Sequence, residues 1–255
     1  MNLGLEGRRA LVLGSTSGLG LAVATALADE GAAVTVSGRH ADTVAHTAAS
    51  LRGSGVPFDL SSAEPIDMFT GPLMKLGRCD ILILNSGGPE PGAASELSPA
   101  ALDAALRTLC SRQVELVTAL LPAMLDAGWG RIVAIGSSGV QSPLPYLASS
   151  NIGRAALAGY LKTLSSEVAE SGVTVNMVLP GRIATARTAA VDAARADRSM
   201  TPVEQVRAGS RTEIPMKRYG RPDEFAAVVA FLCSGLASYV TGEQVRCDGG
   251  LSSAY

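Results

Sequence analysis

A glycine-rich segment near the N-terminus constrains the fold more than any other feature of this 255-residue sequence. Residues 10–13 form a short apolar run, glycines follow at positions 14, 18 and 20, and an apolar segment with helical periodicity comes next. Gly14 permits a tight exit from a strand, and Gly20 permits a helix to lie close to that strand. The segment therefore predicts a strand, a tight turn and a helix, which begin a βαβ unit.

The same turn predicts a site for a phosphate-bearing ligand. A helix N-terminus offers free backbone N–H groups, and Gly18 lets the backbone approach a pyrophosphate. The spacing is G-x-x-x-G-x-G rather than G-x-G-x-x-G, and a glycine triplet alone can be a structural turn. Its place between an apolar strand and an apolar helix favours dinucleotide binding, with contacts expected from Gly14, Ser15, Ser17, Gly18 and Leu19.

Strand-like runs alternate with helical stretches along the rest of the chain. The expected strands are residues 10–13, 33–37, 81–84, 131–135, 173–179 and 244–247, and long helical stretches are expected at 99–127 and 149–171. The strand runs are apolar throughout, as expected for parallel strands covered on both faces. This predicts an α/β fold with a Rossmann-type, doubly wound parallel sheet in three α/β/α layers, as a single domain over residues 1–255.

Residues 184–213 interrupt this rhythm. They mix Arg, Asp, Ala and Thr between two strands that need only a short connection. Because long insertions of this kind often cover a site, we expect a flap that shapes a substrate pocket.

Composition excludes several classes of protein. Hydrophobic residues make up 47% of the chain, yet no apolar run reaches the roughly 18 residues that a membrane span requires. A net charge of −2 gives no basic field for nucleic acid. The N-terminus lacks the charged, apolar and small segments of a signal peptide, which favours a cytoplasmic protein. The excess of apolar surface favours a buried sheet and a homo-oligomer, a tetramer or a dimer.

Cysteines and histidines predict no metal site. The four cysteines are far apart and none has a nearby histidine, so we expect buried thiols rather than zinc ligands or disulfides: Cys79, Cys110, Cys233 and Cys247. His40 and His46 fall on an expected surface helix, where a solvated histidine is the simplest interpretation.

Short motifs accompany the glycine turn along the whole chain. They are Asn-Ser-Gly-Gly at 85–88, Asn176, Pro-Gly-Arg-Ile-Ala-Thr at 180–185, Tyr-Val-Thr-Gly-Glu at 239–243 and Asp-Gly-Gly at 248–250. In combination they resemble the short-chain dehydrogenase/reductase family, and within it the 3-oxoacyl-carrier-protein reductases. The resemblance implies hydride transfer between a nicotinamide cofactor and a ketone or secondary alcohol.

The resemblance also implies further cofactor contacts. Asp59 and Leu60 would flank the adenine, Asn85 and Gly87 would contact the adenosine ribose side, and Ile183 and Thr185 would hold the carboxamide. Ser86, Pro180 and Gly181 belong to the same motifs and are expected to line the site. Asp59 as a loop cap, and Asn85 as a group that stabilises a strand end, remain the structural alternatives.

The end of the second expected strand predicts the choice of cofactor. NAD-binding folds place a carboxylate there for the ribose 2′-hydroxyl, whereas a 2′-phosphate needs a cation. Residues 37–39 are Ser-Gly-Arg, without an acid. Arg39 offers a planar fork for the phosphate, which favours NADP(H) over NAD(H), with a solvated surface arginine as the alternative.

The family's catalytic positions are altered in this chain. The resemblance implies a serine after the fifth strand, a tyrosine thirteen residues later, a lysine four beyond that, and an asparagine upstream. Ser137 matches the serine, but the tyrosine and lysine positions hold Ser150 and Arg154, and the asparagine position falls on Leu109. The helix sequence downstream supports this register without gaps.

Tyr146 is the alternative source of a phenol. It matches the tyrosine position only if four residues are deleted before it and inserted after it, and its i+4 partner is then the uncharged Ser150. One helical turn before the usual position, its phenol could still enter the same cleft for proton transfer. A cleft-lining or packing aromatic is the structural alternative.

Two hypotheses of different classes follow. The first is an atypical reductase, in which Ser137, Ser150 and Arg154 stabilise the substrate oxygen, Arg154 also holds the nicotinamide ribose, and water supplies the proton. The loop at 139–145, stiffened by two prolines, and the flap would shape its pocket. The second is a catalytically silent NADP(H)-binding protein, either a redox sensor or a partner subunit. A third possibility uses the bound nicotinamide for another reaction.

Overall fold

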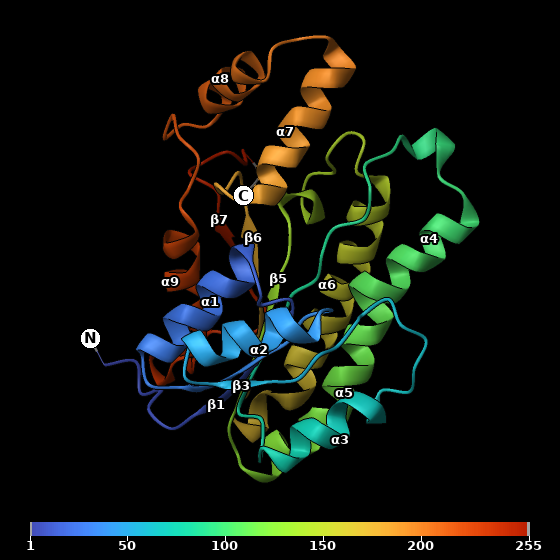
Figure 1. Cartoon of the computed structure of the whole chain (residues 1–255). Coiled ribbons are helices and arrows are strands. Elements are labelled where there is room, and N and C mark those ends of the chain that lie inside the picture. The colour runs from blue at the N-terminus through green and yellow to red at the C-terminus, as the bar shows by residue number, and fades with distance from the viewer. Residues whose placement is uncertain (1, 254–255) are drawn as a thin grey trace.

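One seven-stranded parallel sheet forms the centre of the computed structural model, which describes residues 2–253 (Figure 1). The strand order is β3-β2-β1-β4-β5-β6-β7. The strands are β1 Arg9–Val12, β2 Ala33–Val36, β3 Ser54–Gly55, β4 Ile81–Leu84, β5 Gly130–Ile135, β6 Val173–Pro180 and β7 Gln244–Cys247. The doubly wound parallel sheet predicted from the sequence is confirmed.

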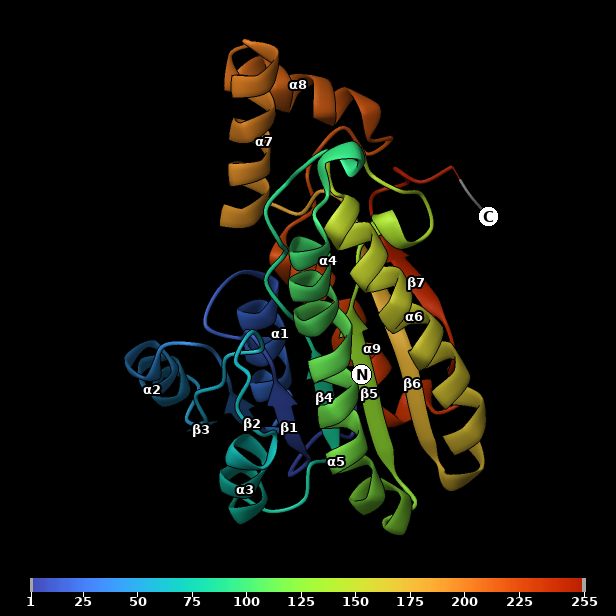
Figure 2. The same cartoon turned by 90° about the vertical axis from the view of Figure 1, so that its right-hand side faces the viewer.

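Helices cover both faces of this sheet. They are α1 Gly18–Asp29, α2 Ala41–Ser50, α3 Asp67–Lys75, α4 Pro99–Leu106, α5 Arg112–Asp126, α6 Ala148–Val168, α7 Ala186–Ser199, α8 Val203–Glu213 and α9 Pro222–Cys233. One buried cluster joins α1, α2 and α9 to the sheet, and a second joins α3, α5 and α6 to the opposite face. Figure 2 shows this layered arrangement. The predicted three layers are confirmed.

Alternation along each strand explains why the strand sequences are apolar throughout. In β1, Ala10 and Val12 pack in the cluster of α1 and α9, whereas Leu11 packs in the cluster of α5 and α6. Because side chains alternate between faces and both faces are covered, the three apolar positions of the strand are buried, and only Arg9 at its start is exposed.

The order of the strands places the site. β1 lies between β2 and β4, with Val12 level with both Val36 and Ile83. The chain winds outward in one direction through β2 and in the other through β4, so the crevice at the carboxyl ends of β1 and β4 is where such folds bind ligands. The glycine turn starts at this point.

Several elements differ from those expected. The stretch 99–127 is not one regular helix, because a π-helical turn, Arg107–Ser111, separates α4 from α5. The two-residue strand β3 was missed because its sequence, Ser54–Gly55, carries no apolar signal. Cys79 and Cys233 are buried, and burial raises the pKa of each thiol to about 12. The expectation of four buried thiols was wrong for Cys110 and Cys247, which are partly exposed.

The segment 184–213 forms the helices α7 and α8, which lie together at one end of the molecule beyond the sheet (Figure 1, Figure 2). α7 is the first helix after β6, which ends at Pro180. Among the described residues, none of the helices has both the length and the apolar character needed to cross a lipid bilayer.

Candidate active site

The glycine turn is held closed by the side chain of the residue that follows β4. Gly14 has a left-handed backbone (φ +54°), and Asn85 Nδ2 donates to the carbonyl oxygens of Leu13 and Gly14, both at 3.1 Å. A Cβ on Gly20 would lie 2.7 Å from Asn85 Nδ2 and closer still to the Gly14 carbonyl oxygen. Helix α1 therefore approaches the turn as closely as only glycine allows.

The N-terminus of α1 is open to a ligand. Gly18 has φ +57°, and a Cβ built there would meet nothing within 4 Å. The N-cap residue Ser17 is exposed and its side chain makes no capping hydrogen bond. Leu19 is partly buried at the edge of the core. Free N–H donors beside open space fit the diphosphate of a dinucleotide.

Ser15 is placed differently from its neighbours in the turn. It is fully buried, its Oγ donates to Val12 O at 2.6 Å, and it accepts from the Ser37 N–H at 3.0 Å. Its own N–H donates to Ser37 O at 2.9 Å. These bonds tie the end of β1 to the end of β2 and leave neither donor of Ser15 free for a cofactor.

Arg39 and Asp59 lie near each other beyond the ends of β2 and β3. Arg39 is exposed, and its guanidinium has no hydrogen bond or ion pair with the rest of residues 2–253. Asp59 accepts from the N–H and the hydroxyl of Ser61, at 2.9 and 2.7 Å. Partial burial opposes ionisation, but the Ser61 hydrogen bonds and the nearby Arg39 hold the pKa of Asp59 below its usual value. Asp59 thus caps its loop while Arg39 remains available.

The remaining predicted contacts line the same edge of the sheet. Ser86 is buried and accepts from Gln113 Nε2 at 3.3 Å, whereas Gly87 is exposed with open space at its Cβ position. Ile183 is buried against Gly220, and Thr185 forms the N-cap of α7. The partly buried residues are Leu60, Pro180 and Gly181. Their contacts with a cofactor stay predictions.

Ser137 and Arg154 both lie at the carboxyl end of β5. Arg154 Nη1 donates to Ile135 O at 2.7 Å, two residues before Ser137. Ser137 Oγ accepts from the Gly139 N–H at 3.1 Å, which leaves its own proton free to donate. Ser150 lies on the first turn of α6, one turn before Arg154, so both residues lie on one side of the helix. This geometry favours the ungapped register.

Arg154 carries its charge at neutral pH. The guanidinium is partly buried, and burial, together with the like charge of Arg187, lowers the pKa of Arg154 to about 10. It therefore supplies a fixed positive charge beside two serine hydroxyls.

Asn151 is a site residue that the sequence analysis missed. Its Nδ2 donates to Leu144 O at 2.9 Å, and its Oδ1 accepts from the Leu144 N–H at 3.3 Å. These bonds hold the loop that follows Ser137 against the start of α6. Its position directly after Ser150 was the available signal.

Tyr146 occupies a strained position at the mouth of the site. Its backbone is left-handed (φ +59°), its carbonyl accepts from the Gly92 N–H at 2.8 Å, and the residue is 53% exposed. The guanidinium of Arg198, from α7, lies 4.9 Å from its ring centroid. The ring thus lies between its loop and the flap.

The residue expected at the family's asparagine position makes an apolar contact. Leu109 lies in the π-helical turn, is buried, and packs against Gly153 of α6. One turn later, Gln113 Nε2 reaches the carbonyl oxygens of Thr108 and Leu109, both at 3.2 Å. The side-chain amide of Gln113 therefore donates to backbone carbonyl groups in the π-helical turn. The sequence pattern did not indicate this role for Gln113.

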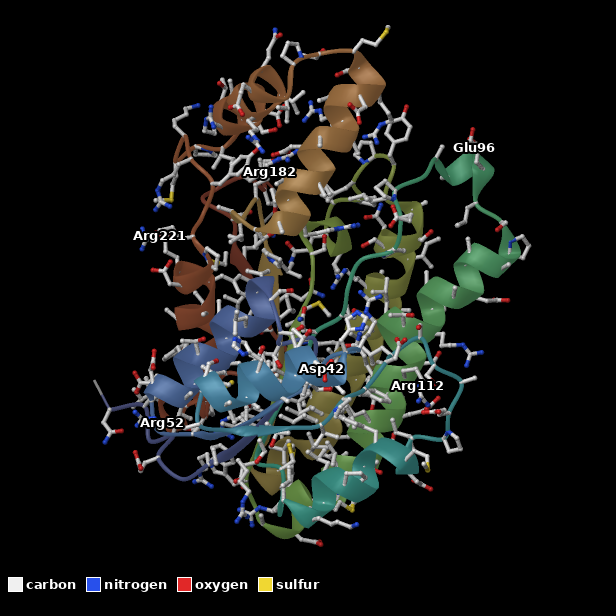
Figure 3. All side chains as sticks on the ribbon, viewed as in Figure 1. Asp42, Arg52, Glu96, Arg112, Arg182 and Arg221 are labelled. Carbon is white, nitrogen blue, oxygen red and sulfur yellow. The ribbon has the colours of Figure 1, made fainter. Side chains whose placement is uncertain are left out.

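Three hydrogen bonds fasten α7 to the segments around it. Asp192 is buried, accepts from Arg182 Nη1 at 2.7 Å, and accepts from the Tyr219 hydroxyl at 2.9 Å. Figure 3 shows Arg182 beside α7. On the other side, Arg187 Nη2 donates to Pro89 O at 2.8 Å, which joins α7 to the loop after β4.

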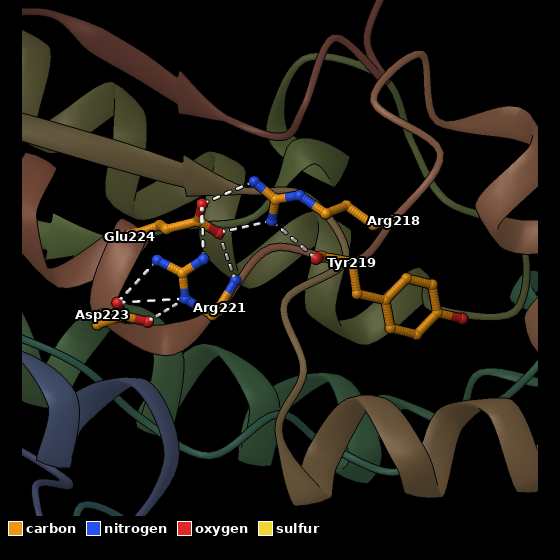
Figure 4. A network of polar contacts seen from close by, with 5 residues as sticks. All are labelled: Arg218, Tyr219, Arg221, Asp223 and Glu224. Atoms are coloured by element: carbon orange, nitrogen blue, oxygen red, sulfur yellow. Dashed lines mark hydrogen bonds and ion pairs between the residues drawn. The ribbon is translucent and has the colours of Figure 1, made fainter.

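A polar network fixes the chain where it returns from the flap. Arg218 makes two hydrogen bonds of 2.7 Å to the Glu224 carboxylate, which also accepts from the Arg221 N–H (Figure 4). The Arg218 hydrogen bonds lower the pKa of Glu224 to about 2. Between these residues, Gly220 pairs with Ile183 as in a parallel sheet. The network thus holds the segment that supports residues 182–184.

A family model described as enoyl-(acyl carrier protein) reductase matches residues 14–252, which is almost the entire chain. The chain belongs to the short-chain dehydrogenase/reductase family. The resemblance inferred from the motifs is confirmed, and the relatives of this short-chain dehydrogenase/reductase are oxidoreductases.

Three relatives illustrate the similarity. The dehydrogenase/reductase SDR family member 4 of Bos taurus is 36% identical over 255 residues, 96% of this chain and 88% of the bovine protein. The 3-oxoacyl-(acyl-carrier-protein) reductase of Aquifex aeolicus is 33% identical over 262 residues, 98% of this chain and all of that protein. The crystal structure of L-sorbose reductase from Gluconobacter frateurii, complexed with NADPH and L-sorbose, superposes with a TM-score of 0.93 at 29% identity, over the full length of both chains.

Proposed function

We propose that this short-chain dehydrogenase/reductase is an NADP(H)-dependent carbonyl reductase that interconverts a ketone and a secondary alcohol. The observation that carries the proposal is the convergence of Ser137 and Arg154 at the end of β5, with Ser150 one helical turn away. Solved relatives with NADPH or NADP bound support the cofactor.

The chain's own groups fit the cofactor. The open N-terminus of α1 at Gly18 would hold the diphosphate, and the unpaired Arg39 would hold the 2′-phosphate. Bound there, NADPH supplies the hydride that the carbonyl carbon accepts. Thr185 would contact the carboxamide end, since it caps α7 directly after the Pro-Gly motif.

Three side chains stabilise the oxygen of the substrate. The Ser137 hydroxyl donates a hydrogen bond, because it accepts from the Gly139 N–H and its own proton is free. Ser150 is the second donor, and Arg154 places a fixed cation beside the negative charge that develops on the oxygen. Donors of this kind contribute about 3–4 kcal/mol each to barrier lowering. Serine and arginine are poor proton donors, so water completes the alcohol.

Tyr146 is the alternative proton donor. Its exposed ring and its contact with Arg198 favour a role at the mouth of the site. Replacing it with phenylalanine separates the two roles: activity within about twofold of the wild type supports a lining role, and a hundredfold loss assigns proton transfer to the phenol.

The decisive experiment combines binding with turnover. NADPH fluorescence measures cofactor binding, and NADPH oxidation is followed with ketones, diketones, quinones and acyl thioesters. Binding with turnover supports the reductase, whereas tight binding without turnover on any compound supports the silent cofactor-binding protein. The double variant Ser150→Tyr with Arg154→Lys should raise ordinary carbonyl reductase activity, and an inert but folded double variant would count against the register.

We also propose that the chain assembles as a homotetramer or homodimer. Large apolar side chains remain exposed in the single chain, on α6 (Ile152), on α9 (Phe231) and just after α9 (Leu236). Light scattering of the purified protein tests this, and a monomer at micromolar concentration would overturn it.

A further inference from the structure

The chain around Ser137 crosses the sheet toward one of its edges. Gly136 lies over Met177 and Leu179 of β6, where a Cβ would come within 2.7 Å of both side chains. The chain then forms one turn of 3₁₀ helix, Ser138–Val140, and reaches β7, the last strand at this edge of the sheet (Figure 2). The turn that carries the Ser137 hydroxyl therefore ends beside a strand that holds no residue of the proposed site.

Gln141, the residue directly after this turn, bonds two side chains of β7. Its Nε2 donates to Gln244 Oε1 at 3.0 Å, and its Oε1 accepts from Arg246 Nε at 2.5 Å. Gln244 and Arg246 are two positions apart, so their side chains lie on the same face of the strand. The bond from the arginine is charge-assisted and stronger than a bond between neutral groups. Both polar atoms of the Gln141 side chain are thus engaged by the edge of the sheet.

The same turn orients the Ser137 hydroxyl. Ser137 Oγ accepts from the Gly139 N–H at 3.1 Å, and Ser137 O accepts from the Val140 N–H at 3.0 Å. Gln141 continues the turn, since its N–H donates to Ser138 O at 3.2 Å. A displacement of Gln141 therefore displaces the Gly139 N–H, which fixes the direction of the Ser137 proton.

Helix α6 fixes the other side of the turn. A Cβ on Gly139 would collide with Asn151 Oδ1, so the turn lies directly against that side chain. Asn151 also holds Leu144, further along the loop. The turn is thus held between two elements that are far apart in the sequence: α6 through Asn151, and β7 through Gln141.

We propose that Gln141 is a positioning residue, which ties the Ser137 turn to β7 and so keeps the Ser137 hydroxyl aimed at the substrate oxygen. Gln141 acts through the turn and not by contact with the substrate. Because a misplacement of about 1 Å costs up to about a hundredfold in rate, loss of the tie lowers kcat and leaves cofactor binding unchanged. This inference rests on the proposed reductase function, whose hydrogen-bond geometry it explains.

Variants of Gln141 separate positioning from stability. Gln141→Leu keeps the approximate size of the side chain and removes both hydrogen bonds, so kcat should fall about tenfold to a hundredfold while the NADPH Kd changes by less than about twofold. Gln141→Glu keeps an acceptor for Arg246, and the Gln244 amide can turn to donate to it, so most of kcat should return. The control is Arg78→Leu, which removes two hydrogen bonds to Asp80 beside the amino end of β4; it should lower Tm and leave kcat unchanged.

Hydrogen exchange tests the tie without turnover. The amides of residues 139–142 all donate within the turn, and their deuterium uptake is followed by mass spectrometry in the wild type and in Gln141→Leu. We expect uptake at least about tenfold faster in the variant, confined to this loop. Unchanged uptake would overturn the proposal even where no compound is reduced, and faster uptake with an unchanged kcat would overturn it by leaving Gln141 a purely structural contact. Faster uptake in the variant of a protein that reduces nothing would overturn the proposed function and support the tie.

Discussion

Replacing Gly20 with alanine should disrupt the cofactor turn from within. The new Cβ would lie 2.7 Å from Asn85 Nδ2 and nearer still to the Gly14 carbonyl oxygen, whereas real Cβ contacts begin above about 3 Å. Because the atom in the way is backbone, which Asn85 also holds by hydrogen bonds, helix α1 must move away from β1. Overpacking of this kind costs about 3 kcal/mol, near the upper end of its usual range.

This cost converts to a measurable change. For a chain of this size, 3 kcal/mol lowers Tm by about 6 °C. Differential scanning fluorimetry measures Tm, and NADPH fluorescence measures binding, which should weaken at least tenfold because the donors of α1 shift. Gly209→Ala in the exposed helix α8 is the matched control: its Cβ meets nothing, and it should raise Tm by about 1–2 °C. A Gly20→Ala protein with the Tm and NADPH Kd of the wild type would refute the reasoning.

Three further predictions concern the pocket. Arg39→Glu should weaken NADPH binding about tenfold to a hundredfold and leave NADH binding intact. The control is Arg52→Glu, at an exposed arginine elsewhere, which should leave the binding of both cofactors unchanged. Equal losses for both cofactors in Arg39→Glu would argue against a contact between Arg39 and the 2′-phosphate. Asn151→Ala removes two hydrogen bonds to Leu144 in the loop after Ser137, so Tm should fall by about 2–4 °C and KM should rise. An unchanged KM would show that these bonds do not hold the loop in the shape that the substrate needs. Arg187→Met removes a like charge and so should raise the pKa of Arg154 from about 10. The loss of activity on a neutral ketone at alkaline pH should then occur at a higher pH. An unchanged pH profile would show that the activity does not depend on the charge of Arg154.

The fold was predictable because its signals are local and repeated. Strand runs such as 81–84 are apolar on both faces, and the structure gives β4 the same bounds, Ile81–Leu84. The glycine turn also carried its own geometry, since the left-handed backbones at Gly14 and Gly18 and the close approach at Gly20 each demand glycine. Strand β3 was not predicted because its two residues are small or polar and form a strand only through pairing with β2, which is a tertiary effect.

The site was predictable only where spacing fixed it. The register of Ser137 and Arg154 follows from counting along the chain, and the hydrogen bond from Arg154 to Ile135 agrees with it. Asn151 was missed because its partner is the backbone of Leu144, in an irregular loop. Arg187 was missed because its partner is the backbone of Pro89, which is distant in the sequence. Ser15 shows the opposite case: it lies within the motif, but its donors are bonded to the ends of β1 and β2.

The central claim is that this altered set of residues still supports hydride transfer. NADPH carrying deuterium at C4 on the transferred face is incubated with the protein and the ketones and diketones of the turnover assay, and the alcohol products are examined by mass spectrometry. The account predicts one deuterium on the carbinol carbon with the wild-type protein, and a rate at least a hundredfold lower for a folded Arg154→Met variant that still binds NADPH. NADPH bound tightly, with no deuterium in any product, would contradict the account and leave a protein that binds the cofactor without using it.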